Sequence, residues 1–168
     1  MQIIELAKKA AGFTVLAFTV SATAYHNLAI FHYNRGVDYA EKQEWDLALA
    51  EYSKAIALNP NYANAYINRG IVYRNQQKWD LALADYNQAI RLNPNDADAY
   101  LNRGNVYDEQ EKWDLAMADY TEAIKLNPND AKAYYNRGNF YYWSTMGIIQ
   151  LTNSHFNALV NRHRGSIK

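Results

Sequence analysis

The stretch "KWDLALADYNQAIRLNPND", residues 78–96, returns almost unchanged as "KWDLAMADYTEAIKLNPND", residues 112–130. The two copies lie 34 positions apart, and the longer segments that contain them, residues 63–96 and 97–130, agree at 24 of 34 positions. Residues 29–62 align in the same frame, and a fourth segment begins at Ala131 before the pattern fades. A fixed period of this length predicts a repeat array, in which each unit buries its apolar face only against its neighbours.

The residue pattern within each repeat predicts two helices. In the first half, aromatic residues and a glycine recur at spacings of four and three, which places Tyr66, Gly70 and Tyr73 on one helical face. The second half has the same spacings, at Trp79, Ala82, Tyr86 and Ala89. The pair Asn93–Pro94 predicts the end of the second helix, because proline disfavours helix at the residue before it. Asp96 and Asp130 then stand where the next helix requires an N-cap.

A glycine recurs in the middle of each first helix, where it costs about 0.5–1 kcal/mol relative to alanine. Because glycine is present in every repeat despite this cost, we expect a close helix crossing that a larger side chain would obstruct. The glycines are Gly36, Gly70, Gly104 and Gly138, and the predicted opposing residues are Ala48, Ala82 and Ala116. The tryptophans Trp45, Trp79 and Trp113 are predicted to start the second helices and to pack on the first.

The pattern Tyr-x-x-Arg-Gly-x-x-Tyr, followed by Ala-x-x-x-Tyr, Ala and Pro, resembles the tetratricopeptide repeat. The resemblance implies an all-α, right-handed solenoid of antiparallel helix pairs. One departure is an arginine where the family usually has leucine, for which we expect the stem along the interface and the head in water. These arginines are Arg35, Arg69, Arg103 and Arg137. The acidic residues of the second helices recur with the period, and we expect them on solvated faces.

The expected segments are a hydrophobic N-terminal segment (1–28), three repeats (29–62, 63–96 and 97–130), a partial fourth repeat (131–143) and a divergent tail (144–168). The tail is predicted to supply a capping helix from about Ser154 to Arg164, or else to be a rearranged end. Uncovered aromatic residues of the partial repeat favour self-association through the C-terminal end as an alternative.

On a helical wheel, a second face of the first helices lies nearly opposite the glycine face. The resemblance implies that this face lines a concave peptide groove. The candidate groove residues are Tyr33, Asn34, Val37, Ile67, Asn68, Ile71, Arg74, Leu101, Asn102, Asn105, Tyr135, Asn136 and Asn139. Position 6 of every repeat is asparagine, whose amide can bond both polar groups of a peptide backbone. The aliphatic and aromatic members predict apolar pockets. The alternative is a solvated surface copied by duplication.

Some relatives in this family clamp a partner's C-terminal carboxylate with basic residues and asparagines at fixed repeat positions. In one frame this chain offers Tyr33, Val37, Asn68, Asp98 and Asn102, so only the central asparagine fits. In the other frame it offers Ile67, Ile71, Asn102, Lys132 and Asn136, which adds one lysine. We therefore expect no clamp of this kind.

The N-terminal segment contains the uncharged stretch "AAGFTVLAFTVSATA", preceded by Lys8 and Lys9 and closed by Ala22-Thr23-Ala24. This order is typical of a secretory signal peptide. The prediction is export to an extracytoplasmic compartment or membrane attachment through residues 10–30. The alternative is a helix packed on the first repeat in a cytoplasmic protein.

The composition points away from catalysis. The chain has no cysteine, its formal net charge is zero, and its four histidines are scattered. We expect no enzyme activity, no cofactor, no metal and no nucleic-acid partner. The predicted function is a scaffold that binds an extended peptide or a partner helix in the groove. The alternatives are a self-associating assembly subunit and a regulatory partner of a separate enzyme.

Overall fold

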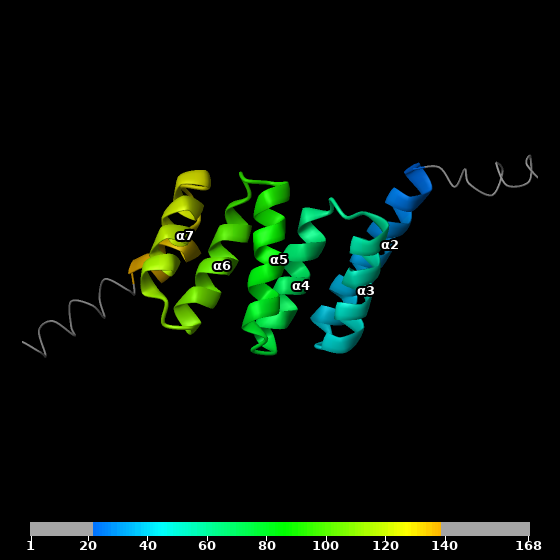
Figure 1. Cartoon of the computed structure of the whole chain (residues 1–168), viewed down its shortest axis with the longest axis horizontal. Helices are drawn as coiled ribbons and strands as arrows, with labels where there is room; N and C mark the ends of the chain where they lie inside the picture. The colour runs from blue at the N-terminus through cyan, green and yellow to red at the C-terminus, as the bar shows by residue number, and fades with distance from the viewer. Residues whose placement is uncertain (1–21, 139–168) are drawn as a thin grey trace, which may run out of the picture. The chain divides into compact units, whose positions relative to one another are not determined.

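The computed structural model describes residues 22–138, and in this part the regular secondary structure consists of helices alone (Figure 1). Residues 131–138 are helical and open the fourth repeat. The complete helices are α2 (Ala22–Glu41), α3 (Trp45–Leu58), α4 (Ala63–Asn75), α5 (Trp79–Leu92), α6 (Ala97–Glu109) and α7 (Trp113–Leu126). The helices pack as the pairs α2–α3, α4–α5 and α6–α7, which confirms the predicted all-α fold of helix pairs.

The described helices belong to two compact units. The first unit extends to Asn93 and contains α2 to α5. The second unit starts at Pro94 and contains α6, α7 and residues 131–138. Within the first unit, α3 also packs on α4, and α2 touches α4.

The turn inside each helix pair has one left-handed residue that is not glycine. These residues are Gln43, Gln77 and Glu111, with φ of 60°, 58° and 59°. At the end of α4, Gln77 N donates to Arg74 O (2.8 Å) and Lys78 N donates to Tyr73 O (2.9 Å). These two bonds form a Schellman motif, which closes the helix and reverses the chain. The second helix then starts at the recurring tryptophan, as the sequence predicts.

The connection between repeats follows the predicted turn and cap. Asn93 ends α5 in an extended conformation, and its N–H still donates to Ala89 O. Asp96 caps α6 by accepting a hydrogen bond from Asp98 N at 3.1 Å, and Asp130 accepts one from Lys132 N at 2.9 Å. Both predicted caps are confirmed.

The predicted crossing at the glycines exists, but the opposing residue is a tyrosine and not an alanine. A Cβ on Gly70 would lie 2.7 Å from Tyr86 Cε1, and a Cβ on Gly104 would lie 2.8 Å from Tyr120 Cε1. Gly36 has the same relation to Tyr52, at 2.6 Å. The predicted alanines Ala48, Ala82 and Ala116 are buried, but the ring is the group nearest to each glycine. The glycine therefore makes room for a flat ring.

Helix α2 begins seven residues before the first repeat was expected to start at Ala29. Residues 23–28 of this extension are exposed, and Ala29 is buried. Between residues 22 and 138, no helix has the length and apolar character that a membrane crossing requires. The remaining part of the predicted export segment and the whole tail 144–168 lie outside the described residues.

Candidate functional site

The candidate groove residues differ widely in exposure. Asn34 and Tyr135 are exposed, and Asn139 lies outside the described residues. The half-buried members are Tyr33, Val37, Asn68, Ile71, Arg74, Asn102, Asn105 and Asn136. Ile67 and Leu101 are buried, with only 7% and 6% of their surface exposed.

The prediction that Ile67 and Leu101 form open apolar pockets is therefore wrong. Leu101 belongs to a core cluster that includes Tyr120 and Ala133. The first helices are buried on two sides, because each packs on its own second helix and also on the adjacent repeat. In the first unit, Val72 of α4 packs on Ala48 and Tyr52 of α3. The solvent-accessible face of each first helix is therefore narrower than a helical wheel of one helix indicates.

An open hollow of about 300 Å³ lies between α2 and α4 in the first unit. Three of the candidate residues, Val37, Asn68 and Ile71, line it. The hollow is also lined by Ala40, Glu41, Trp45, Tyr52, Val72 and Asn75. Trp45 and Tyr52 come from α3, and of these two only Trp45 was singled out in the sequence, as a packing residue. Both residue types recur in every repeat, which could have drawn attention to them. Recurrence alone, however, does not distinguish a residue that lines a pocket from one that only packs in the core.

Asn68 is held by tyrosines of the preceding repeat. Its Nδ2 donates to Tyr33 Oη at 3.0 Å. Burial raises the pKa of Tyr52 to about 12, the nearby Tyr33 adds to the increase, and a hydrogen bond with the Asn68 amide acts in the opposite direction. The asparagine at position 6 therefore connects two repeats at this point.

A similar connection exists in the second unit. Asn136 Nδ2 donates to Asn105 Oδ1 at 2.7 Å, and Tyr120 Oη donates to the same oxygen at 3.0 Å. Asn102 instead donates to Asp98 O of its own helix at 2.8 Å. The four asparagines at position 6 therefore make different contacts, and Asn34 is exposed on the surface. Whether any of them binds a peptide stays a prediction.

The recurring arginine forms a buried ion pair with an acid of the second helix. Arg69 donates from Nε and Nη2 to the two Asp85 oxygens, both at 2.8 Å. Arg103 binds Asp119 in the same way, at 2.8 and 2.7 Å. The hydrogen bonds to the carboxylates raise the pKa of both arginines against the effect of burial. We call this arrangement the arginine clasp.

Two predictions are corrected by the arginine clasp. Glu51, Asp85 and Asp119 are buried, so these acids do not belong to a solvated face. The Arg69 and Arg103 side chains are paired with these acids and only 19% and 20% exposed, against the prediction of a head group in water. Each sits near the rings before and after it, and the Arg103 carbon lies 5.5 and 5.9 Å from the ring centres of Tyr100 and Tyr107. Two-point bonding and flanking rings compensate for the loss of hydration.

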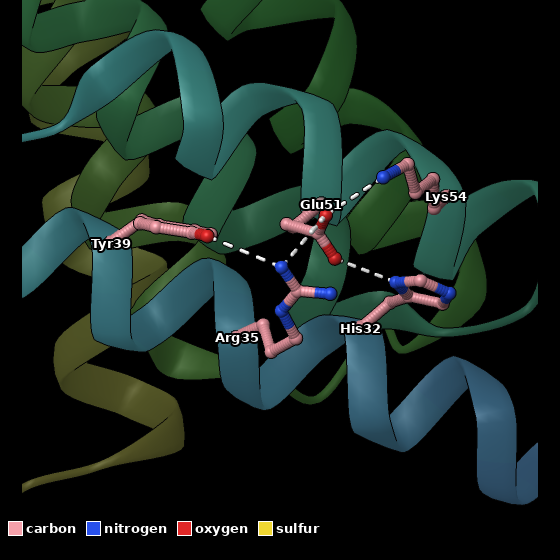
Figure 2. Close-up of polar contacts among 5 residues, drawn as sticks. All are labelled: His32, Arg35, Tyr39, Glu51 and Lys54. Atoms are coloured by element: carbon pink, nitrogen blue, oxygen red, sulfur yellow. Dashed lines mark hydrogen bonds and ion pairs between the residues drawn. The ribbon is translucent and has the colours of Figure 1, made fainter.

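The first repeat carries a different version of the clasp (Figure 2). Glu51 is at the centre, where its carboxylate contacts His32 Nδ1 at 2.6 Å and Lys54 Nζ at 2.8 Å. Arg35 stands 4.0 Å from Glu51 and donates to Tyr39 Oη at 3.2 Å. Burial by itself would raise the Glu51 pKa, but hydrogen bonds from Lys54 and His32 and the Arg35 charge outweigh it, and the pKa is lowered.

Comparison with known proteins agrees with the helix-pair geometry. TPR repeat models match residues 36–77 and 72–110, and tetratricopeptide repeat models match residues 97–130 and 119–159. The chain belongs to the tetratricopeptide repeat family. No match to a curated protein was found.

Solved tetratricopeptide domains share the fold. The Arabidopsis OM64 TPR domain aligns with a TM-score of 0.69 at 23% identity, over 70% of this chain and 98% of that domain. The first TPR of Spaghetti (RPAP3), bound to the HSP90 peptide SRMEEVD, aligns with a TM-score of 0.69 at 25% identity, over 71% and 95%. The second TPR domain of human RPAP3, in complex with the HSP70 peptide SGPTIEEVD, aligns with a TM-score of 0.65 at 26% identity, over 68% and 96%.

Proposed function

We propose that this chain is a non-enzymatic scaffold that holds an extended peptide of a partner protein in the hollow between α2 and α4. The observation that carries the proposal is the make-up of this hollow. Val37, Ile71 and the Trp45 ring give it an apolar lining, and Glu41, Asn68 and Asn75 supply polar groups. An apolar site with a few polar groups is the usual form of a specific binding pocket.

The hollow indicates the chemistry of the peptide. A space of about 300 Å³ accepts one large apolar side chain. Asn75 and Glu41 are exposed at the last turns of α4 and α2. The Asn75 amide can bond the peptide backbone, and the Glu41 carboxylate favours a basic residue beside the apolar one. We therefore propose a client with an apolar residue next to a lysine or arginine.

An acidic C-terminal tail does not fit these groups. The two RPAP3 domains carry peptides that end in EEVD. In the frame that starts at the first repeat, this chain has none of the basic residues of a carboxylate clamp, and Glu41 lines the hollow. A glutamate pair brought close to Glu41 would be repelled. The proposed client is thus a peptide of different charge.

The experiment is a selection of random displayed peptides on the full chain, followed by affinity measurements on variants. We expect Ile71→Glu to weaken the selected peptides tenfold or more, which is about 1.4 kcal/mol. Leu81→Glu is the matched control, because Leu81 is a 49% exposed aliphatic residue on α5. It should leave the affinity unchanged. The peptide SRMEEVD serves as a second probe and should not bind.

Two results would overturn the proposal. One is a selection that yields no peptide with affinity for the full chain. The other is a set of peptides that bind the Ile71→Glu and Leu81→Glu variants equally well. Binding of SRMEEVD would contradict the proposed charge of the client.

A further inference from the structure

A second open hollow adjoins the hollow between α2 and α4 in the first unit. It has a volume of about 320 Å³, and its lining includes Glu44, Trp45, Asp46 and Gln76. Trp45 lines both hollows, and Asn75 of the first is followed in the chain by Gln76 of the second. We call the second space the acidic hollow. Because the two hollows share the Trp45 ring, one peptide can place neighbouring side chains in both.

The charge of the acidic hollow is specific to the first repeat. The residue before the recurring tryptophan is Lys78 in the second repeat and Lys112 in the third, but it is Glu44 in the first. The residue after the tryptophan is aspartate in all three repeats. The first repeat therefore has two carboxylates where each of the others has a lysine and an aspartate. Both of these acids, Glu44 and Asp46, are exposed.

The polar groups of the acidic hollow have acceptor capacity left for a ligand. Asp46 Oδ1 accepts a long hydrogen bond from Gln76 Nε2, at 3.4 Å, and an ionised carboxylate accepts several such bonds. Gln76 Oε1 is buried and has no hydrogen-bond partner in the described part of the chain. A buried acceptor without a partner is costly. These groups favour a cation that brings several N–H donors.

Arginine fits this set of groups better than lysine. Its planar guanidinium has five N–H donors, binds a carboxylate at two points and stacks on an aromatic ring. The acidic hollow supplies the Trp45 ring and the carboxylates of Glu44 and Asp46. A lysine ammonium is more strongly hydrated, so it loses more on entering such a site. The arginine clasp of this chain combines the same groups, a carboxylate and flanking rings.

We propose that the acidic hollow is a subsite for an arginine side chain of the client, close to the apolar residue that the first hollow accepts. The inference rests on the proposed function for the client that brings the arginine. It narrows the basic residue of this client to arginine, and it assigns Glu44 and Asp46 as its partners in addition to Glu41.

The test uses N-acetyl-arginine amide as the probe, so that it does not depend on the selected peptides. The indole N–H signal of Trp45 is followed in NMR spectra of the full chain and is assigned with Trp45→Phe. We expect a saturable shift, which N-acetyl-lysine amide produces only weakly. Glu44→Lys should abolish the shift, because it places a positive charge in the hollow. This variant should fold normally, since lysine stands at this position in the other two repeats.

Two control variants separate the acidic hollow from its surroundings. Asp80→Asn changes the corresponding aspartate in the first turn of α5 and should leave the shift unchanged. Ile71→Glu changes a residue that lines the first hollow and not the acidic one, and it should retain the shift. Peptides selected on Glu44→Lys should keep their apolar residue and lose their preference for arginine.

Two results would overturn the inference. One is the absence of a saturable Trp45 shift with the arginine probe in the unmodified chain. The other is a shift of the same size in Glu44→Lys, which would place the arginine outside the acidic hollow. Equal shifts with the arginine and lysine probes would contradict the preference for arginine. A failed peptide selection would overturn the proposed function alone, because the probe tests the acidic hollow without a peptide.

Discussion

Arg103 and Asp119 lie on opposite helices of one repeat and are joined by two hydrogen bonds, of 2.8 and 2.7 Å. Both groups lie inside the helix pair, with one fifth of the arginine side chain and 7% of the aspartate side chain exposed. Arg69 and Asp85 repeat the relation one period earlier. A charged pair therefore stands in this tetratricopeptide array where an aliphatic contact is usual in the family.

Removal of one partner of the arginine clasp should be costly. Asp119→Ala leaves Arg103 without its carboxylate, and we expect a loss of about 3 kcal/mol in the free energy of unfolding. Asp114→Ala is the control on the same helix, where the exposed carboxylate stands in the first turn and its loss should cost less than about 1 kcal/mol. Urea unfolding of both variants measures the two free energies of unfolding. Equal losses in Asp119→Ala and Asp114→Ala would show that the arginine clasp adds no stability.

The glycines should respond differently to the same substitution. Gly104→Ala places a Cβ 2.8 Å from the Tyr120 ring, and we expect a loss of about 1–3 kcal/mol. Gly138→Ala meets no described residue within 4 Å and should be neutral or stabilise the helix by about 0.5 kcal/mol. Thermal unfolding of the two variants tests this, and similar losses would mean that backbone freedom, and not the ring, requires glycine.

The Glu51 carboxylate should make the free energy of unfolding depend on pH. Its pKa is lowered in the fold, so the stability that its charge provides is present above the pKa of the unfolded chain and is lost as the pH falls through the folded value. Glu51→Gln removes this contribution. The difference in unfolding free energy between the two proteins should therefore be larger at about pH 5.5 than at about pH 3.

The matched control for Glu51 is Glu44→Gln, which changes an exposed carboxyl in the turn before α3. Its free energy of unfolding should stay within about 0.5 kcal/mol of that of the unmodified chain. A Glu51→Gln variant whose deficit stayed constant between these two pH values would argue that the carboxylate charge adds no stability.

Asparagines of the same repeat position should differ in their contribution to stability. Asn68→Ala removes the hydrogen-bond partner of Tyr33 and of the buried Tyr52, and we expect a loss of about 1–2 kcal/mol. Asn34→Ala changes an exposed side chain and should stay within about 0.5 kcal/mol of the unmodified chain. Chemical unfolding separates the two, and an unchanged Asn68→Ala protein would favour a surface role for this amide.

Periodicity was sufficient to predict the helices because it records local geometry. The tryptophan at the start of each second helix and the Asp96 cap depend on neighbours in the sequence, and both are confirmed. The burial of Asp85 depends on Arg69, sixteen residues away on another helix. No single-helix pattern distinguishes such an acid from a solvated one.

The site was predictable only in part, for a related reason. Val37, Asn68 and Ile71 were identified because they face away from the glycine of their own helix. Leu101 was misjudged because it packs in one cluster with Ala133 of the next repeat, and a wheel of one helix does not contain such a contact. The left-handed Gln77 was not foreseen, since glycine is the residue expected at that conformation.

The prediction of export or membrane attachment rests mainly on residues 1–21, which lie outside the described residues. Cleavage after Ala24 would remove the first 24 residues, and membrane attachment would keep them. The intact mass of the protein purified from its native cell measures this directly. We expect a mature chain that begins at Tyr25 or a full chain in the membrane fraction, and a full-length chain in the soluble fraction would contradict both.

The most direct test of the peptide-binding account is a nuclear Overhauser map between the full chain and a selected peptide. The account predicts contacts from one apolar side chain of the peptide to the Trp45 ring and the Ile71 methyl groups. Contacts to Leu47 or Leu81, the exposed leucines of α3 and α5, would contradict it and would place the binding surface on the second helices.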